Sequence, residues 1–188
     1  VQQAPCFSHT LFGEAFYTFP LAVKRLSGAV DVLPITVGER ILKELPSEGD
    51  ELLIYGQLRS YNMKYGCSSR LFITVFARNV CEKPVDSPCC NEISLIGYVC
   101  KPPVYRTTPF SREITDVMLA VNRAYRKSDY LPIIAWGRNA RYLSNMCVGD
   151  KLTIHGRAQS RQYQKALPDG SVLERVAYEV SAFSVEGE

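Results

Sequence analysis

Gly49-Asp50-Glu51-Leu52-Leu53-Ile54-Tyr55-Gly56 returns 100 positions later as Gly149-Asp150-Lys151-Leu152-Thr153-Ile154-His155-Gly156. In the second of these stretches, apolar Leu152 and Ile154 alternate with polar residues, and this period of two predicts a β-strand with one buried face. The aspartate and both glycines keep their spacing in the two copies. The pattern therefore indicates that one β-rich unit occurs twice in the chain.

The repeat extends toward the beginning of each half. Leu21-Ala22-Val23-Lys24-Arg25 recurs as Leu119-Ala120-Val121-Asn122-Arg123, and Asp31-Val32-Leu33-Pro34-Ile35 recurs as Asp129-Tyr130-Leu131-Pro132-Ile133, both at a separation of 98. The same separation pairs Val1 with Val99, whereas the alternating run at 91–98 has no counterpart in the sequence. We therefore expect the first copy to lack its first strand, which would leave one sheet edge open.

Most of each copy is predicted as strand. In the second copy, segments rich in Val, Ile, Tyr and Thr lie at 114–123, 130–136, 151–161 and 173–183, and the strand at 51–60 is equivalent to that at 151–161. One helix is expected at 139–146 and its equivalent at 39–45. Five short strands with a helix between the third and fourth are typical of an OB-type Greek-key barrel. The predicted fold class is all-β, with two tandem five-stranded OB barrels.

A short segment separates the two copies. Glu82-Lys83-Pro84-Val85-Asp86-Ser87-Pro88-Cys89-Cys90 contains two prolines and no apolar periodicity, which is typical of a linker. We therefore predict a first, degenerate OB-fold domain at residues 1–81, a linker at 82–90 and a second OB-fold domain at 91–188.

The composition is that of a globular protein, with 46% hydrophobic and 22% charged residues. The apolar runs are much shorter than the roughly 18 residues of a membrane span, and no secretory signal begins the sequence. Seven cysteines without a CxxC pair predict free thiols in a reducing cytoplasm rather than a disulfide framework or a metal site. We therefore expect a cytoplasmic protein without membrane segment, metal or cofactor.

The net charge is +3, and the whole excess lies in the second half, which has thirteen Lys and Arg against ten Asp and Glu. There, cations stand next to aromatic residues, as in Arg123 and Tyr125, or Arg161, Tyr163 and Lys165. Cations neutralise phosphates, and flat rings stack on bases of any sequence. Aromatic residues of strands more often belong to a core, but burial beside these cations would desolvate charges. The pattern therefore favours binding of a single-stranded nucleic acid.

Four stretches of the second copy follow one another at 91–97 (NEISLIG), 119–123 (LAVNR), 131–140 (LPIIAWGRNA) and 149–161 (GDKLTIHGRAQSR). In this order and spacing they resemble the successive strands of bacterial single-stranded DNA-binding proteins. The likeness covers nearly all of residues 91–185 and extends more weakly to residues 1–80 through the repeat. It implies sequence-independent binding and protection of single-stranded DNA in DNA replication, recombination or repair.

The resemblance also implies which residues contact DNA. The base-stacking aromatics of the family fall on four aromatic residues of this chain, and nearby cations are expected to contact phosphates. The predicted DNA-binding residues are Arg123, Tyr125, Tyr130, Trp136, Arg138, Arg157, Arg161, Tyr163 and Lys165. In the first copy the repeat brings Ser27, Val32, Gly38 and Met63 to the stacking positions, so we expect no ring there. Weaker, secondary contacts are predicted at Lys24, Arg25, Arg59 and Tyr61.

The family resemblance extends to assembly. Bacterial members bring four OB barrels together, so a chain with two barrels is expected to form a homodimer. Members also commonly end in an acidic segment that recruits replication and repair proteins, whereas this sequence ends Ser184-Val185-Glu186-Gly187-Glu188. Either such a tail has been removed from this sequence, or partner recruitment works differently in this protein.

Two other classes of function compete with this interpretation. An enzyme is not expected, because the sequence has no GxxxxGK[ST], HExxH or GxSxG motif. Of the two histidines, His155 is expected on the outward face of a strand and His9 in a loop. The alternative that stays open is an OB-fold protein-interaction module of a replication complex that binds DNA weakly.

Overall fold

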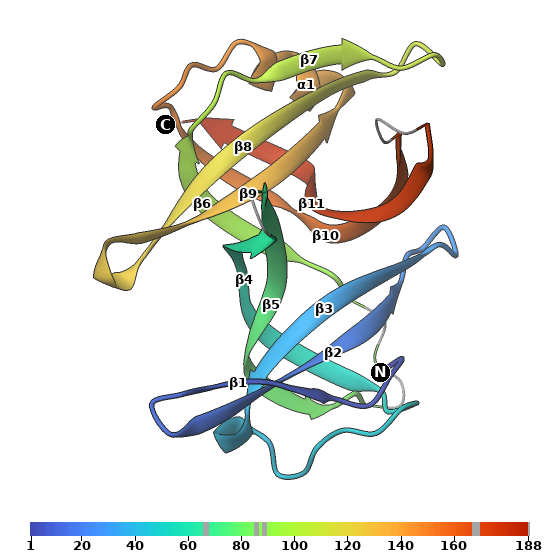
Figure 1. Ribbon diagram of the computed structural model, residues 1–188. Helices are drawn as coiled ribbons and strands as arrows, with labels where there is room; N and C mark the ends of the chain where they lie inside the picture. The colour runs from blue at the N-terminus through green and yellow to red at the C-terminus, as the bar shows by residue number, and fades with distance from the viewer. Residues whose placement is uncertain (66–67, 85–86, 88–89, 167–169, 188) are drawn as a thin grey trace. The chain divides into compact units, whose positions relative to one another are not determined.

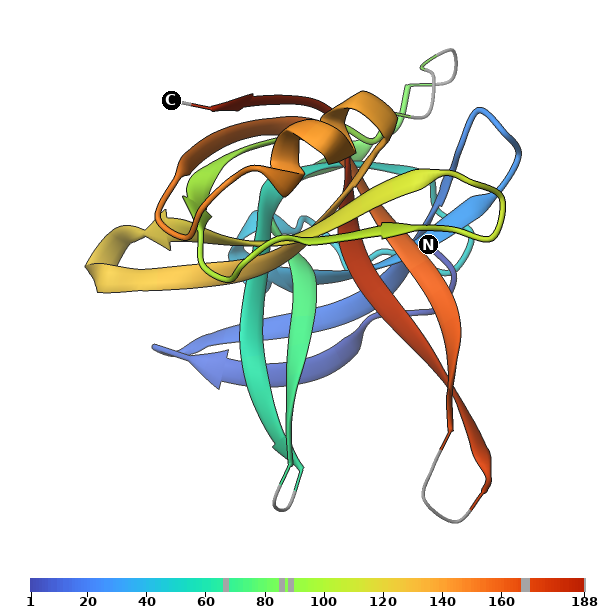
Figure 2. The same ribbon diagram turned by 90° about the horizontal axis from the view of Figure 1, so that it is seen from above.

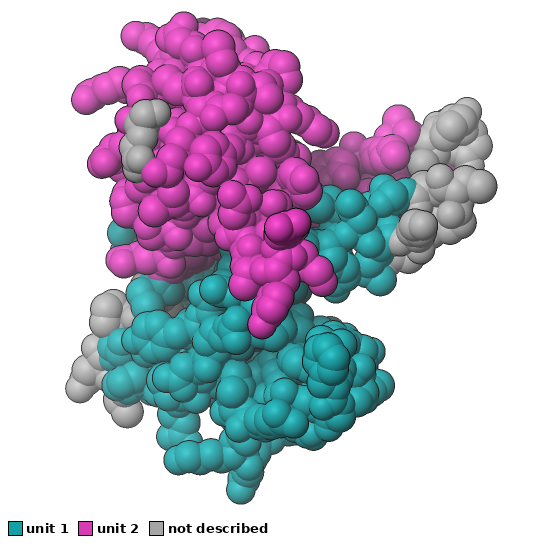
Figure 3. All heavy atoms as spheres, turned by 90° about the vertical axis from the view of Figure 1, so that its left-hand side faces the viewer, with its two compact units in different colours: residues 1–90 teal, residues 91–188 magenta. Residues whose placement is uncertain are grey.

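Two β-sheets contain most residues of this computed structural model, which describes residues 1–65, 68–84, 87, 90–166 and 170–187 (Figure 1). The chain divides into two compact units, unit 1 (Val1–Cys90) and unit 2 (Asn91–Glu188), which Figure 3 colours separately. Each unit has its own sheet and its own buried apolar residues.

Unit 2 contains a closed five-stranded barrel. Its elements are β6 (Ile93–Val99), β7 (Val104–Thr107), β8 (Glu113–Arg123), the 3-10 turn η2 (Ala124–Arg126), β9 (Lys127–Trp136), α1 (Gly137–Ser144), β10 (Lys151–Ala166) and β11 (Val172–Gly187). The sheet order is β6-β10-β11-β9-β8-β7, and β6 also pairs with β8. This second pairing of β6 closes the ring, and β7 lies outside it, paired with β8 alone.

The interior of this barrel is apolar. Alternate residues of the strands point inward, and α1 adds two further buried side chains, as expected for an amphipathic helix that covers a barrel. The Thr115 hydroxyl donates a hydrogen bond of 2.7 Å to the carbonyl oxygen of Ala140 and so joins β8 to α1. The fully buried apolar residues are Leu119, Leu131, Ala135, Ala140, Leu143, Leu152, Ile154 and Val180.

A β-bulge bends β10. The register with β11 shifts between His155 and Gly156, and a Cβ atom at Gly156 would lie 2.2 Å from the carbonyl oxygen of Ser181. Only glycine permits such a close approach. Unit 1 has the same bulge at Gly56, where a Cβ atom would lie 2.3 Å from the carbonyl oxygen of Phe76. Beyond its bulge, β10 leaves β6 and continues with β11 as a two-stranded arm (Figure 2).

Among the described residues, unit 1 repeats the strand order of unit 2 and has no strand equivalent to β6. Its elements are β1 (Cys6–Leu11), β2 (Glu14–Lys24), β3 (Val30–Gly38), the 3-10 turn η1 (Glu39–Ile41), β4 (Leu52–Tyr65) and β5 (Ser68–Glu82). The sheet order β1-β2-β3-β5-β4 corresponds strand for strand to β7-β8-β9-β11-β10. Phe19, Leu33, Ile35, Val37 and Ile73 form its buried apolar core.

The sheet of unit 1 ends at β4. In unit 2, β6 pairs with Lys151–Gly156 of β10 and ends at Val99, whose backbone bonds to Gly149 and Asp150 at 2.9 Å each. Val1 makes the equivalent contacts, because its carbonyl accepts from the Gly49 amide at 2.9 Å and its amino group donates to the Asp50 carbonyl at 2.7 Å. The backbone position of Val1 therefore corresponds to that of Val99, as the separation of 98 predicts.

The two expected helices differ from the structure. Helix α1 begins two residues before the expected 139–146, and the helix expected at 39–45 is wrong, since only the single turn η1 forms there. Ile41 and Leu45 are exposed, so a helix here would have no buried apolar face to stabilise it. Pro46 also disfavours helical backbone at the residue before it.

The described cysteines are free thiols, namely Cys6, Cys81, Cys90, Cys100 and Cys147. Cys67 and Cys89 lie outside the described residues, as do residues 85, 86 and 88 of the expected linker at 82–90, and Glu82 of that linker is the last residue of β5. None of the described helices is long and apolar enough to cross a membrane.

Candidate nucleic-acid interface

The residues of β9 that alternate with its core positions form the outer face of unit 2. Leu131, Ile133 and Ala135 are buried, whereas Tyr130 and Trp136 are 47% and 41% exposed. Residues opposite each other on neighbouring strands share a face, so the strand registers identify the other members. They include Asp116 and Met118 on β8, Ile134 on β9, Arg157, Gln159, Arg161 and Tyr163 on β10, and Arg175, Glu179 and Ser181 on β11, of which Ile134, Gln159, Glu179 and Ser181 are buried.

Tyr125 lies at the tip of the β8–β9 hairpin and is 94% exposed. Tyr125 and Arg126 have φ angles of 61° and 54°, the left-handed region that a tight hairpin turn requires but that a Cβ atom disfavours. At the equivalent turn of unit 1 the left-handed position belongs to Gly28. An exposed ring on strained backbone is a candidate for function, because nothing in the fold requires a tyrosine there.

A buried ion pair closes the base of this hairpin. Arg123 lies 2.9 Å from the buried carboxylate of Asp129. In unit 1 the repeat-equivalent Arg25 donates to Asp31 through two hydrogen bonds, of 2.6 and 2.5 Å. Arg123 was predicted as a phosphate contact and Arg25 as a secondary DNA contact, and the structure gives each of them a structural partner. Any contact of Arg123 or Arg25 with DNA remains a prediction.

Strand β10 carries most of the predicted cations. The Arg161 guanidinium lies 5.9 Å from the ring centroid of Tyr163, and Lys165 is exposed farther along the arm. Arg157 lies 5.5 Å from the ring centroid of Phe183, and its buried Nε has no hydrogen-bond partner within the described part of the chain. Phe183 was missed by the sequence reasoning, because no repeat or motif indicates that a ring at this position is exposed.

Arg138 differs from the other predicted residues. It is exposed on α1, whereas Tyr130, Trp136, Arg157 and Tyr163 lie on strands and share the outer face. The structure therefore brings the β9 and β10 residues onto one surface, with Tyr125 at the hairpin tip and Arg138 on the helix.

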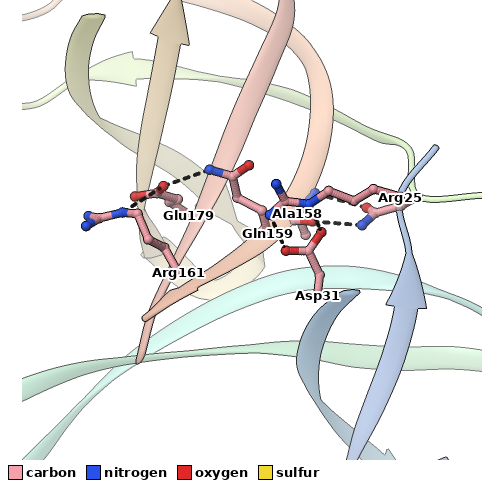
Figure 4. A network of polar contacts seen from close by, with 7 residues as sticks. Arg25, Asp31, Ala158, Gln159, Arg161 and Glu179 are labelled. Atoms are coloured by element: carbon pink, nitrogen blue, oxygen red, sulfur yellow. Dashed lines mark hydrogen bonds and ion pairs between the residues drawn. The ribbon is translucent and has the colours of Figure 1, made fainter. Parts of the chain in front are cut away.

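Two carboxylates also lie on the outer face. Glu179 accepts a hydrogen bond of 2.7 Å from Nε2 of Gln159, and Nε of Arg161 lies 3.4 Å from the same oxygen (Figure 4). Asp116 accepts from Nε of Arg106, which reaches across from β7, at 2.8 Å. This hydrogen bond raises the pKa of Arg106, as do the charges of Asp116 and Glu179, so the guanidinium stays charged.

Unit 1 has rings on its equivalent face, at positions that the repeat did not predict. The Arg59 guanidinium covers the ring of Phe76 at 3.8 Å, and Tyr61 lies against Phe72 with centroids 5.0 Å apart. Ser27, Val32, Gly38 and Met63 supply no ring, as expected, but the neighbouring strand β5 supplies two. The register of β4 and β5 places Phe72 and Phe76 opposite Tyr61 and Gln57, which the sequence alone does not reveal.

Both histidines lie on strands. His155 is exposed on β10, as expected. His9 was expected in a loop, which is wrong, because it lies on β1 with its ring stacked on Phe16 at 5.0 Å. Within the ranges that the structure describes, no three His, Cys, Asp or Glu side chains are grouped so that they could hold a metal ion.

A family model confirms the resemblance of the second copy. The model of the single-strand binding protein family matches residues 90–186, slightly more than half of the chain. The chain belongs to the single-strand binding protein family. Its family match covers the whole barrel of unit 2, including both strands that carry the predicted stacking residues.

Curated relatives of this family member are named single-stranded DNA-binding proteins. Single-stranded DNA-binding protein 3 of Clostridium acetobutylicum is 35% identical over 100 residues, which are 48% of this chain and 68% of that protein. Single-stranded DNA-binding protein A of Bacillus subtilis is 31% identical over 81 residues, 39% of this chain and 47% of that protein. The alignments thus span between about half and two thirds of these relatives.

Solved structures match the chain over its whole length. The wild-type single-stranded DNA binding protein from Thermus aquaticus matches with a TM-score of 0.78 at 20% identity. The match covers 100% of this chain and 88% of the Thermus aquaticus chain. A deletion mutant of the same protein gives a TM-score of 0.72 at 20% identity. At this identity the likeness establishes the fold, which is that of the OB-fold members of the single-strand binding protein family.

Proposed function

We propose that this protein binds single-stranded DNA without sequence preference, by stacking bases on aromatic rings and neutralising phosphates with arginines. The observation that carries the proposal is the outer face of unit 2. Two exposed rings on β9 and a third on β10 share one surface with Arg157 and Arg161. Rings accept any base, and the salt-dependent contacts of the arginines do not depend on sequence.

Two features support a ligand on this face and at the tip of the β8–β9 hairpin. The buried Nε of Arg157 lacks a hydrogen-bond partner among the described residues, and a buried donor without an acceptor is costly unless a ligand supplies one. Tyr125 is held at a strained hairpin tip with its ring in solvent. The membership of the family and the names of the relatives agree with single-stranded DNA as that ligand.

We assign the stacking to Tyr125, Tyr130, Trp136 and Tyr163, and phosphate contacts to Arg157, Arg161 and Lys165. Arg123 and Arg138 have secondary roles in this proposal. Arg123 is paired with a buried carboxylate, and Arg138 lies on α1 rather than on the sheet. Replication, recombination and repair are the processes in which such binding would act.

Unit 1 has a weaker DNA-binding role in this proposal, or an architectural one. We treat residues 1–81 and 91–188 as tandem OB-fold domains joined by a linker at 82–90. The Phe76 ring of unit 1 is covered by Arg59, so the ring face that a base would need is already occupied. A base could still stack on the outer side of the guanidinium or on Tyr61, and this makes Lys24, Arg25, Arg59 and Tyr61 secondary candidates.

We further propose that the edge of β4 takes up an additional strand, in the place that β6 has in unit 2. The correspondence of the Val1 and Val99 backbone contacts supports this antiparallel register. A closed barrel would cover Leu52–Gly56 and remove an open edge. If so, joining a strand of β6-like sequence before Val1 should raise the melting temperature of the protein. An unchanged melting temperature would contradict the proposed pairing.

Assembly into a homodimer with four barrels is the proposed oligomeric state, and replication and repair proteins are proposed partners. Both proposals rest on the family alone. Mass measurement in solution by light scattering would give about twice the chain mass of 21.1 kDa for the dimer. A mass equal to that of one chain would exclude it under the conditions used.

The test of DNA binding is a titration with a fluorescent single-stranded oligonucleotide, in the presence and absence of competing duplex. Tight binding that resists duplex supports the proposal. Trp136→Ala and Tyr163→Ala should each weaken binding by about 1–3 kcal/mol, and the matched unit 1 variants Tyr61→Ala and Lys24→Ala should weaken it less. Equal losses in both units would assign the main site to both, and absence of binding at low salt would favour the protein-interaction module.

A further inference from the structure

The outer face of unit 2 carries negative charge at a position where a phosphate-binding surface would be expected to have none. Glu179 is 8% exposed and lies in the same cross-strand row as Gln159, next to Arg161. Asp116 lies on the same face and is paired with Arg106. Carboxylates repel phosphates, and a buried carboxylate is costly unless it is paired and hydrogen-bonded.

Unit 1 shows that the fold does not need a carboxylate at this place. Because β4 and β10 have the same bulge and the same pairing, Thr74 occupies in unit 1 the position that Glu179 has in unit 2. Thr74 is 3% exposed and is satisfied by neutral partners, through hydrogen bonds to the Thr36 hydroxyl at 2.8 Å and the Pro34 carbonyl at 3.0 Å. Packing and hydrogen bonding are therefore possible here without a charge.

The position of Asp116, the second carboxylate, also has an uncharged residue in unit 1. The separation of 98 places Thr18 of unit 1 at the position of Asp116, and Ser8 at the position of Arg106. Unit 2 therefore has an acid at both positions, each beside an arginine. Unit 1 has a threonine at both, Thr18 and Thr74. The acids accompany the exposed stacking rings of Tyr130 and Trp136, which unit 1 lacks at the equivalent positions.

We propose that Asp116 and Glu179 compete with DNA phosphates for Arg106 and Arg161, and thereby make binding on this face depend on base stacking. This inference rests on the proposed function. A phosphate that binds Arg161 must either replace Glu179 as its partner or share the guanidinium with it. Contacts to the DNA backbone alone therefore contribute little binding free energy. A single strand also places bases on the rings of β9, which offsets this cost, whereas the bases of a duplex are already stacked. The acid pair thus keeps ligands that offer only phosphates weakly bound, and leaves the rings to decide which ligand is held.

The arrangement fits this role in its geometry. The Arg161 side chain is half exposed and its contact with Glu179 is long, at 3.4 Å, so an incoming phosphate can reach the guanidinium. Glu179 keeps a short hydrogen bond to Gln159, at 2.7 Å, and so remains in place when Arg161 moves. The carboxylate is therefore fixed while its arginine partner is exchangeable.

The test is the salt dependence of binding by Glu179→Gln, an isosteric variant that can still accept from Gln159. Freed from competition, Arg161 should bind phosphate more strongly, so that affinity for a single-stranded oligonucleotide rises by up to roughly fivefold, the worth of one exposed ion pair. The log-log salt slope should steepen by about 0.7. Affinity for duplex should rise by a similar factor from its lower level, because the same contact is released. The matched control is Glu174→Gln on the same strand, whose side chain lies on the opposite face and should change neither.

A second variant separates competition from simple repulsion. In the background of Arg161→Gln, which by itself should flatten the salt slope, Glu179→Gln should have almost no further effect. Equal effects of Glu179→Gln with and without Arg161 would overturn the proposal, as would an unchanged or reduced affinity of Glu179→Gln in the otherwise native protein. If the native protein fails to bind single-stranded DNA, the proposed function falls and this inference falls with it. Native binding with an unaffected Glu179→Gln variant overturns only the inference.

Discussion

Substitution of Tyr125 separates DNA binding from folding more cleanly than substitution of any other predicted ring. With 94% of its surface exposed, the ring contributes almost no buried apolar area, so Tyr125→Ala should change the free energy of unfolding by less than about 0.5 kcal/mol. If the ring stacks on a base, the same variant should lose about 1–3 kcal/mol of binding free energy, or roughly five- to 150-fold in affinity. Tyr125→Phe keeps the ring and should keep the affinity.

A third variant at the same position, Tyr125→Gly, tests the strain of the backbone. Because Tyr125 has a φ of 61°, Tyr125→Gly should relieve about 1 kcal/mol of left-handed strain and so raise stability, while binding falls as in the alanine variant. Chemical denaturation and oligonucleotide titration of the three variants give both quantities. Alanine and phenylalanine variants of equal affinity would refute the stacking role, and a destabilised glycine variant would refute the argument from strain.

Three further predictions concern the framework around the face. Gly156→Ala should lower the free energy of unfolding by about 1–3 kcal/mol, because the new Cβ atom meets backbone; an unchanged urea midpoint would contradict the close approach. Asp129→Ala should cost about 3 kcal/mol by leaving Arg123 unpaired and half-buried, and a smaller loss than that of an exposed ion pair would show that the pair is unimportant. Burial raises the pKa of the Cys100 thiol, so its thiolate forms only at higher pH; a thiol reagent at pH 8 should therefore label it more slowly than the exposed Cys147, and equal rates would exclude a protected Cys100.

The internal repeat predicted that strands of the two units are equivalent, whereas β1 and β7 were not predicted and His9 on β1 was expected in a loop. The strands expected at 151–161 and 51–60 correspond to β10 and β4, although both strands extend farther, into the arm where local alternation is weaker. The helix expected at 39–45 failed for a physical reason. A short helix depends on tertiary packing, and sequence does not show that Ile41 and Leu45 stay in solvent whereas Ala140 and Leu143 are buried.

Some features of the candidate site follow from local sequence, and others depend on strand register. Tyr130 and Trp136 were predicted as DNA contacts from the family resemblance, and their place on the outer face follows from their alternation with the core residues of β9, which is local information. The position of Glu179 beside Arg161 depends on the pairing of two strands after a bulge, which no single stretch of sequence contains. The pairing of Arg123 with Asp129 had a signal that was not used, since Arg25 and Asp31 recur at the same separation.

The ion pairs of Arg25 with Asp31 and Arg123 with Asp129 have a consequence for how such hairpins change. Each ion pair holds the base of its hairpin in place, so the barrel does not depend on the residues at the tip. The hairpin tips Ser27-Gly28 and Tyr125-Arg126 can then be exchanged, because both hairpins have the same ion-paired base. Exchange of the two tips between the units should leave both barrels folded and transfer an exposed ring from one to the other. A duplicated unit with such a hairpin base can gain or lose an exposed ring at the tip by two substitutions, while its core stays unchanged.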